Sequence, residues 1–464
     1  MKKILFGKNV VVALLLIVIL SGWLYRDSFS AYFFQDDWFT LRISQAKSIF
    51  DILGFFIPRG DVIYYRPLGM QIPFWLLRSL FGISSLPFHI LTMMTHFLNI
   101  ILVFFLVRLL QKRNMMALII SFLYGTSSVH YIPFFWSSTY PFVLGPTCFL
   151  ISSILLLLYL KNRIMSYYYL SIIIFILSLL VSEMTIVSPL LFFFYFLILE
   201  KEKRSRLLLP YFIFGAIMFF LRVIFFPLSA SGYYQLGLGK YLLNNLEGYL
   251  LWSFSWPEEM KAQLVNFFTI NPQFIKDFGF YFRIFTATLF INLLLFYILP
   301  LIVTFKRKKK EAFNVFLFGI LWFIIGLLPV IFFPRHAFSY YLPISLLGLL
   351  FSSIYLFNEL FSVIYSRYKL FAYLLVFILL INWLVISTVT IDFNANVHWA
   401  PRRAKISLRL VEQAKKSYHG ELNIYVPSSS ENNLSLNNQD GLKVVFGNDD
   451  IVTIYGNKVD GGAL

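Results

Sequence analysis

Long runs of uncharged, apolar residues recur through the chain as far as residue 391, and they constrain its fold more than any other feature. Each run is close to the roughly 20 residues that a helix needs to cross about 30 Å of hydrocarbon. Strands of a membrane barrel would alternate in polarity, which these runs do not, so we expect helices. Because 59% of the residues are hydrophobic and only 13% are charged, a water-soluble core could not bury this surface. The sequence therefore predicts an all-α polytopic membrane protein.

The apolar runs predict about eleven transmembrane helices. The expected crossings cover residues 9–25, 86–107, 115–130, 142–160, 165–181, 184–199, 207–228, 281–303, 313–333, 338–358 and 370–391. About half of the 39 Lys and Arg residues lie in the N-terminal segment and in the alternate short connections on its side of the membrane. Cytoplasmic loops are enriched in such residues, so we expect a multi-pass protein of the cell membrane with a cytoplasmic N-terminus. Since this clustering explains most of the cations of the membrane part, the net charge of +17 does not indicate a nucleic-acid partner.

The predicted orientation leaves three segments outside the membrane that are large enough to form structure of their own. Two are outer loops, residues 26–85 and 229–280, within a membrane domain that covers residues 1–391. The third is a tail that begins at Asp392, and residues 392–464 are expected to form a small extracytoplasmic domain.

Local patterns predict elements in two of these segments. Residues 71–82 of the first loop suit an amphipathic helix that lies on the membrane surface, because they are too few to cross it. In the tail, residues 421–426, 441–446 and 450–455 are typical of short strands separated by turn residues. We therefore expect an amphipathic first outer loop and a small mixed α/β C-terminal domain.

Two adjacent carboxylates, Asp36 and Asp37, follow directly after the first predicted crossing and are flanked by aromatic residues. An anion near hydrocarbon is poorly solvated and needs a cation, a metal or a raised pKa. A solvated loop within an aromatic belt is one interpretation of this pair. The functional alternative is a general base or a metal-binding carboxylate. No ligand cluster in the sequence requires a metal, so a divalent cation on Asp36 and Asp37 is left open and no other cofactor is expected.

Further polar residues follow in the first loop and the second crossing. Tyr65 and Arg66 precede a proline, whose rigid backbone suits Arg66 for pairing with phosphate, or structurally with Asp36 or Asp37. His96 lies on the second crossing, on one face with His89 and Asn99. Such a stripe favours interhelical hydrogen bonding over catalysis, although both interpretations stay open.

Several charged residues are predicted to share the outer interface with the acidic pair. Glu183 and Arg222 lie near the outer ends of two crossings, and Arg335 and His336 lie in an outer connection. Arginine binds phosphate with a planar fork, whereas a carboxylate can deprotonate a hydroxyl group. A substrate with a phosphate at the level of the lipid headgroups, attacked by an acceptor from outside, would use both. Polyprenyl-phosphate sugars have this geometry.

The order of these motifs resembles the GT-C superfamily of polytopic glycosyltransferases, in particular the branch related to protein O-mannosyltransferases. The resemblance covers the chain to about residue 391. It rests on Asp36-Asp37, on Tyr65-Arg-Pro-Leu68 and the His/Asn helix after it, on Ser182-Glu183, and on Arg335-His336 leading into Tyr340-Tyr-Leu-Pro343.

The resemblance implies roles for these residues. Members of the superfamily use a lipid-linked sugar as donor, usually with inversion at the anomeric carbon. Asp36 would be the base or metal-binding residue, with Asp37 as the alternative. Arg222 and Arg335 would hold the donor phosphate, and Glu183 would shape a substrate pocket. The residues expected to bind the donor phosphate or the substrate are Tyr65, Arg66, His96, Glu183, Arg222, Arg335 and His336.

We therefore predict a membrane glycosyltransferase that moves a hexose or pentose from a polyprenyl-phosphate donor to an extracytoplasmic glycan, lipid or protein. Membrane lipids would surround it. A flippase or transporter of lipid-linked glycans is an alternative, but it should spread its charged groups through the depth of the membrane. A polymerase that joins whole glycan units is a second alternative, compatible with broad outer loops.

Overall fold

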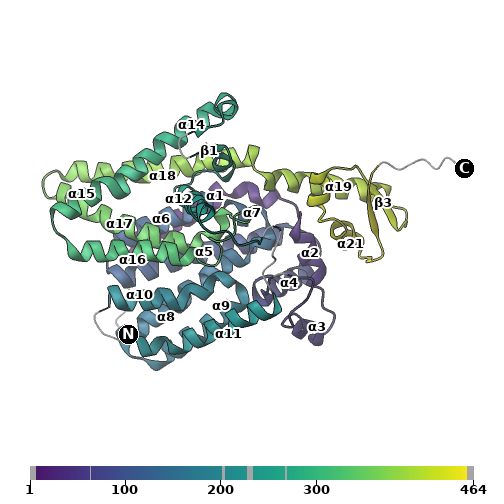
Figure 1. The fold of residues 1–464 in the computed structure, drawn as a ribbon, viewed down its shortest axis with the longest axis horizontal. Coiled ribbons are helices and arrows are strands. Elements are labelled where there is room, and N and C mark those ends of the chain that lie inside the picture. Colours follow the sequence, from purple (N-terminus) through teal and green to yellow (C-terminus); the bar gives the residue numbers. More distant parts are fainter. Residues whose placement is uncertain are drawn as a thin grey trace, which may run out of the picture.

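The computed structural model describes residues 7–62, 64–200, 204–226, 232, 234–266 and 269–456. Lys2, Lys3, Lys201 and Lys203, on which the predicted orientation partly rests, lie outside these residues, as do six residues of the predicted outer loop 229–280. The described chain is mostly helical, and its long helices lie side by side in one bundle (Figure 1).

The first third of the chain contains short helices on either side of the first long ones. Its elements are α1 (Lys8–Leu24), η1 (Arg26–Ser30), α2 (Asp36–Ile43), α3 (Ile49–Gly54), η2 (Pro67–Gln71), α4 (Ile72–Phe81), α5 (Leu86–Gln111), α6 (Asn114–Thr126), η3 (Ser128–His130), α7 (Tyr131–Phe135), η4 (Ser137–Thr139) and α8 (Pro141–Asn162), where η marks short 3₁₀ or π segments.

The middle of the chain continues the bundle. It contains α9 (Met165–Val181), η5 (Glu183–Val187), α10 (Ser188–Ile198), η6 (Ser205–Leu208), α11 (Leu209–Phe225), α12 (Lys240–Ser253), α13 (Glu258–Ala262), the antiparallel strands β1 (Leu264–Asn266) and β2 (Thr269–Ile270), α14 (Pro272–Leu293), η7 (Leu294–Ile298), α15 (Leu299–Lys306), α16 (Lys310–Leu327), η8 (Ser339–Tyr341), α17 (Pro343–Tyr365) and α18 (Lys369–Val397).

Seven helical stretches in the described part of the chain are long and apolar enough to cross a membrane. An eighth is reached if Asn114–Thr126 and Ser128–Phe135, which meet at 42°, form one bent span. Three shorter apolar helices, Lys8–Leu24, Met165–Val181 and Glu183–Ile198, coincide with the remaining predicted crossings. An apolar helix thus lies at every predicted crossing, but only seven or eight have the length of a full span. The count of eleven stays a prediction.

The C-terminal segment combines helices and strands. It contains α19 (Trp399–Ser417), β3 (Asn423–Val426), α20 (Ser430–Ser435), α21 (Asp440–Phe446) and β4 (Val452–Tyr455), and β3 pairs with β4 in parallel. The last long helix, α18, runs past the predicted boundary at residue 391. Whether the segment forms a domain of its own stays a prediction.

The predicted strands of this segment are confirmed at β3 and β4, but the strand predicted at residues 441–446 is wrong. These residues form helix α21, which ends at Gly447 with a φ of 64°. A short apolar run cannot be assigned to helix or strand from its periodicity alone, and a left-handed glycine after it is a helix-ending signal. In the first loop, the amphipathic helix predicted at residues 71–82 is confirmed as a helix by α4, which buries Phe74 and Leu77.

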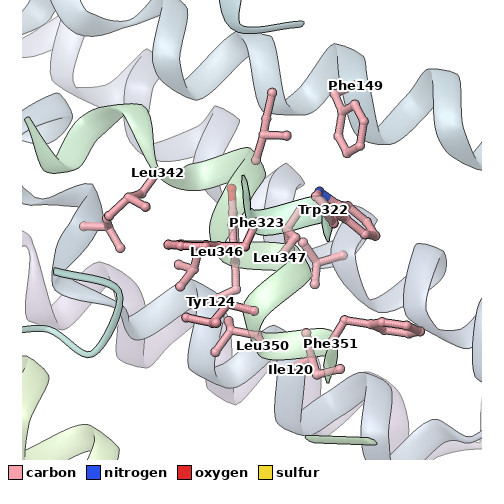
Figure 2. Close-up of a cluster of buried hydrophobic side chains, with 14 of the residues drawn as sticks. Ile120, Tyr124, Phe149, Trp322, Phe323, Leu342, Leu346, Leu347, Leu350 and Phe351 are labelled. Carbon is pink, nitrogen blue, oxygen red and sulfur yellow. The ribbon is translucent and has the colours of Figure 1, made fainter. Parts of the chain in front are cut away.

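The main core lies where α16 and α17 pack against the helices around them. Figure 2 shows buried side chains of this core, among them Tyr124, Trp322 and Phe351. The helices approach closely because glycines face each other. A Cβ atom on Gly319 would lie 2.6 Å from the carbonyl oxygen of Gly348, so no side chain fits there.

A second core joins the first loop to the C-terminal segment. Trp38 and Leu41 of α2 are fully buried in it, together with Val411 of α19 and Leu442 of α21. The Trp38 indole Nε1 also donates a hydrogen bond of 3.0 Å to the Ser407 hydroxyl oxygen. Figure 1 shows α2 and α4 beside α19 and α21 at one end of the bundle. The helix that carries the acidic pair therefore rests on the C-terminal segment.

Candidate functional site

Asp37 is a fully buried carboxylate near the N-terminus of α2. Its Oδ2 atom accepts a hydrogen bond of 3.2 Å from the Phe34 amide, and its Oδ1 atom accepts one of 2.7 Å from the Ser138 amide. Burial raises the pKa of Asp37 to about 7, although these hydrogen bonds oppose the shift. Since both of its carboxylate oxygens accept hydrogen bonds from backbone amides, Asp37 links the start of α2 to η4.

Asp36, the first residue of α2, is partly exposed. Within the described part of the chain, its carboxylate has no hydrogen bond or salt bridge. Burial raises the pKa of Asp36 to about 6, the charges of Arg66 and Arg403 oppose this shift, and that of Asp440 adds to it. Of the two acids, Asp36 is therefore the one whose oxygens are available to a ligand.

Arg66 pairs with Glu183, not with Asp36 or Asp37. Its Nε atom donates to Glu183 Oε2 at 2.7 Å, and its Nη2 atom donates to Glu183 Oε1, so the pair is bidentate. The guanidinium also lies over the rings of Tyr64 and Phe142. Burial disfavours the charged form of Arg66, but the Glu183 carboxylate more than offsets this and holds its pKa above the usual value. The pair explains how Glu183 is stabilised at a helix end that carries no cation nearby in the sequence.

A close backbone approach brings these two residues together. Gly69, in η2 just after Arg66, lies against the end of α9, and a Cβ atom there would be 2.2 Å from the Val181 carbonyl oxygen. Only glycine lets two backbones approach so closely. The first loop therefore packs directly against the end of α9, which brings Arg66 within reach of Glu183.

A cavity of about 1190 Å³ opens beside this pair. One part of its wall is apolar and comes from α9, α10 and α11, with residues such as Leu179, Leu190 and Phe212. The other part is polar and aromatic. Its residues are Tyr64, Tyr65, Arg66, Glu183, Arg222, Tyr234, His336 and Tyr341. The cavity is thus amphipathic, and its charged groups lie close together, because Arg66 pairs with Glu183 and the charges of both act on Arg222 and His336.

Arg222 and His336 complete the charged part of the wall. Arg222 donates a hydrogen bond of 2.7 Å to the Phe226 carbonyl oxygen and feels the charges of both Glu183 and Arg66. The ring of His336 lies 4.4 Å from that of Tyr234. Burial and the Arg66 charge lower the pKa of His336 to about 4, so at neutral pH it is an uncharged donor and acceptor. Arg222 supplies a positive charge beyond the neutralised Arg66–Glu183 pair.

The structure brings most of the predicted site residues together, but not all of them. Tyr65 lines the cavity and donates to the Phe56 carbonyl oxygen at 2.8 Å. Asp36 does not line it, although its charge acts on Tyr64 and Tyr234, which do. Arg335 is exposed and outside the lining.

His96 lies in the core, away from the cavity lining. Its Nε2 atom donates to the Gly125 carbonyl oxygen at 3.0 Å, and its ring packs against His130. His89 and Asn99 likewise donate to carbonyl oxygens, those of Ala31 and Val143. This is the interhelical hydrogen bonding that was one interpretation of the stripe.

Two residues of the site carried no sequence signal. Tyr234 lies in a loop without a motif, and burial raises its pKa to about 12. Arg403 lies in the C-terminal segment, far from the acidic pair in sequence.

Among the residues that the structure describes, no group of three or more His, Cys, Asp or Glu side chains could hold a metal ion. A metal on Asp36 would thus need ligands from the substrate or water.

Comparison with known proteins gives a likeness in fold. No protein-family model and no curated protein matches the chain. Among solved structures, the archaeal oligosaccharyltransferase AglB from Archaeoglobus fulgidus, in complex with an inhibitory peptide and a dolichol-phosphate, is 13% identical with a TM-score of 0.50. The match covers 97% of this chain and 64% of that chain. The apo form of the same oligosaccharyltransferase is 14% identical, again with a TM-score of 0.50, over 96% of this chain and 64% of that chain.

At this identity the likeness shows the fold alone, and the chain spans less than two thirds of the length of these neighbours. The fold is therefore similar to that of an oligosaccharyltransferase, and the resemblance to GT-C glycosyltransferases stays a prediction. The branch related to protein O-mannosyltransferases stays a prediction.

Proposed function

We propose that this chain is a membrane glycosyltransferase that takes a sugar from a polyprenyl-phosphate donor and transfers it to an extracytoplasmic glycan, lipid or protein. The observation that carries this proposal is the amphipathic cavity. It combines an apolar wall with arginines and tyrosines. Asp36, whose carboxylate has no hydrogen bond or salt bridge in the described part of the chain, lies near enough for its charge to act on Tyr64 and Tyr234 of the lining.

The apolar wall suits the isoprenoid chain of the donor. Phe212, Phe219 and Phe220 of α11 line the cavity, and their side chains are exposed and not covered by other helices. An isoprenoid chain that enters from the bilayer would pass from one apolar environment into another and gain little free energy. The contacts of the headgroup would therefore determine where the lipid binds.

The charged part of the wall suits the donor phosphate. In the described part of the chain Arg222 forms no ion pair of its own, although the Glu183 charge acts on it, and the one hydrogen-bond partner of Arg66 Nη1 is the Met70 sulfur at 3.9 Å. The neutral His336 can add a hydrogen bond. A guanidinium group binds phosphate strongly in such a poorly solvated place.

Asp36 would act as the base. In an inverting transfer the acceptor hydroxyl oxygen attacks the anomeric carbon, its proton passes to the Asp36 carboxylate, and the bond from that carbon to the phosphate oxygen breaks. Polyprenyl phosphate leaves with the bonding electrons, held by Arg222. Asp37 takes no part in this step because its oxygens are bound to the backbone.

The solved neighbours support the choice of substrates. One oligosaccharyltransferase structure holds a dolichol-phosphate and an inhibitory peptide, which are a lipid phosphate and a peptide ligand. A cytoplasmic N-terminus would place the cavity's charged part at the outer leaflet. A flippase is disfavoured because the charged residues gather in one part of the cavity and do not follow its apolar wall.

The test is the variant Asp36→Asn. Membranes from cells that lack the chain would be supplied with either form and assayed for transfer from labelled polyprenyl-phosphate sugars extracted from the same cells. Loss of a general base lowers the rate by about 10²- to 10⁴-fold. The matched control is Asp27→Asn, which changes an exposed acid of the same loop and should leave the rate unchanged. Full activity of Asp36→Asn at normal protein levels would refute the assignment.

A further inference from the structure

The residue before Asp36 has an unusual backbone. Gln35 is the N-cap of α2, with a φ of 53° and a ψ of −129°. Residues other than glycine rarely adopt a positive φ, and they keep it only when their surroundings impose it. The direction in which α2 leaves Gln35 therefore depends on what holds this residue.

The C-terminal segment holds Gln35 from two sides. Its amide donates a hydrogen bond of 3.1 Å to the Ser435 carbonyl oxygen at the end of α20. Its side-chain Oε1 atom accepts a hydrogen bond of 2.7 Å from Arg403 Nη1 on α19.

Arg403 is itself fixed by its neighbours. Its Nε and Nη2 atoms both lie 3.3 Å from the carboxylate of Glu431, and its guanidinium lies 5.0 Å from the ring centre of Trp399. Its side chain is only 15% exposed. A guanidinium held by an ion pair and a ring has a fixed orientation, and its third nitrogen atom, Nη1, donates to Gln35.

The two sequence neighbours of Asp36, Gln35 before it and Asp37 after it, are both held by hydrogen bonds. Asp37 is bound to the Phe34 and Ser138 amides, and Gln35 is bound to Arg403 and Ser435. Asp36 has no bond of its own in the described chain, so its carboxylate is placed entirely by the residues that flank it.

We propose that Arg403, through its hydrogen bond to Gln35, is a positioning residue that sets the direction of the Asp36 carboxylate. The C-terminal segment then acts as a support for the reactive helix. This inference rests on the proposed function, since it needs Asp36 to be the reacting group. Arg403 touches neither the substrate nor the reacting atoms.

The experiment compares Arg403→Ala and Gln35→Ala in the transfer assay with labelled polyprenyl-phosphate sugars. Displacing a reactive group by about 1 Å can cost about 100-fold in rate. We expect kcat to fall about 10- to 100-fold in each variant, with the donor KM within about twofold of wild type. Both changes remove the same hydrogen bond, so the double variant should lose no more than the larger single loss, which we expect for Arg403→Ala because it also removes a charge that acts on Asp36.

The control and the protein levels distinguish positioning from folding. Arg402→Ala removes the neighbouring cation, which also pairs with Glu431 but is 58% exposed and does not contact Gln35, so its kcat should stay at the wild-type value. Gln35→Ala keeps the Arg403–Glu431 pair, so its folding should be normal even if Arg403→Ala weakens the C-terminal segment.

Two results would overturn the proposal. If Asp36→Asn is inactive while Gln35→Ala and Arg403→Ala keep the wild-type kcat, the positioning role is wrong and the proposed function stands. A rise in the donor KM at unchanged kcat would also refute positioning. If Asp36→Asn is itself fully active, the proposed function falls together with this inference.

Discussion

The cavity and the acid-bearing helix α2 are built in different ways. The cavity is lined by helices of the bundle and by residues of the first loop, and most of its charge is neutralised within its own wall by Arg66 and Glu183. Helix α2 lies at the end of the bundle and is held by the C-terminal segment, through Trp38 and Gln35. In the proposed function, donor binding thus depends on the residues of the cavity wall. The position of the base, Asp36, depends on contacts with the C-terminal segment. Changes in the two regions should have different signatures.

Removing Arg66 should cause the largest loss of stability. Arg66→Ala leaves the Glu183 carboxylate, which is 34% exposed, without its partner beside an apolar wall, and breaking this partly buried pair costs about 2–3 kcal/mol, less than for a fully buried pair. Equilibrium unfolding in detergent micelles would measure this. The control is Arg59→Ala, which breaks an exposed pair with Asp61 in the same loop and should cost less than about 1 kcal/mol. Equal losses would mean that the Arg66–Glu183 pair stabilises the protein no more than an exposed pair does.

A methyl group on Gly69 should push the two halves of the cavity wall apart. In Gly69→Ala the new Cβ atom would meet the Val181 carbonyl oxygen, and overpacking of this kind costs about 1–3 kcal/mol. We expect less stable protein and weaker donor binding. Gly60→Ala is the matched control, since nothing lies within 4 Å of its Cβ position. Normal donor binding by Gly69→Ala would show that the loop can shift without consequence.

Replacing Arg222 should weaken donor binding without destabilising the protein. Loss of one charged hydrogen bond to a phosphate corresponds to about 1.4 kcal/mol, so Arg222→Ala should raise the donor KM about tenfold. Arg335→Ala sharpens this test, because the structure places Arg335 outside the lining and its effect should be smaller. A larger effect of Arg335→Ala would mean that Arg335, the other arginine that the resemblance assigns to the donor phosphate, is its main ligand.

The pH dependence should show the smallest effect, and it reports on α2. The base must be ionised, and the pKa of Asp36 is raised to about 6, so kcat/KM should fall by half at pH 6. The effect on stability has the opposite sign. A carboxyl group whose pKa is raised by folding destabilises the protein as pH rises from about 4 to about 6. A rate that is constant down to pH 4.5 would contradict the assignment.

Much of the fold could be predicted because long apolar runs have few alternatives in a bilayer. Every predicted crossing coincides with an apolar helix, and α4 lies where an amphipathic helix was expected. The strand predicted at residues 441–446 is wrong because the burial of this short run depends on Leu436 and on helices α2 and α19, which local periodicity does not show. Short segments near the end of a chain are decided by their tertiary contacts.

The site could be predicted only in part, for a related reason. Sequence patterns single out charged residues at helix ends, and so they identify Asp36, Arg66, Glu183 and Arg222. They do not show which partners these residues have. The bond of Arg66 to Glu183 joins residues 117 positions apart, and that of Arg403 to Gln35 joins residues 368 apart. Only the folded chain shows that Asp37 is fixed while Asp36 is free.

One measurement separates the two regions most directly. Purified wild type, Asp36→Asn and Arg222→Ala in lipid nanodiscs would be compared for binding of a radiolabelled polyprenyl-phosphate sugar and for release of free polyprenyl phosphate in the presence of acceptor membranes. We predict that Asp36→Asn binds the donor as wild type does but releases polyprenyl phosphate about 10²- to 10⁴-fold more slowly, and that Arg222→Ala binds the donor about tenfold more weakly. Wild-type release by Asp36→Asn, or failure of the wild type to bind the donor, would contradict the account.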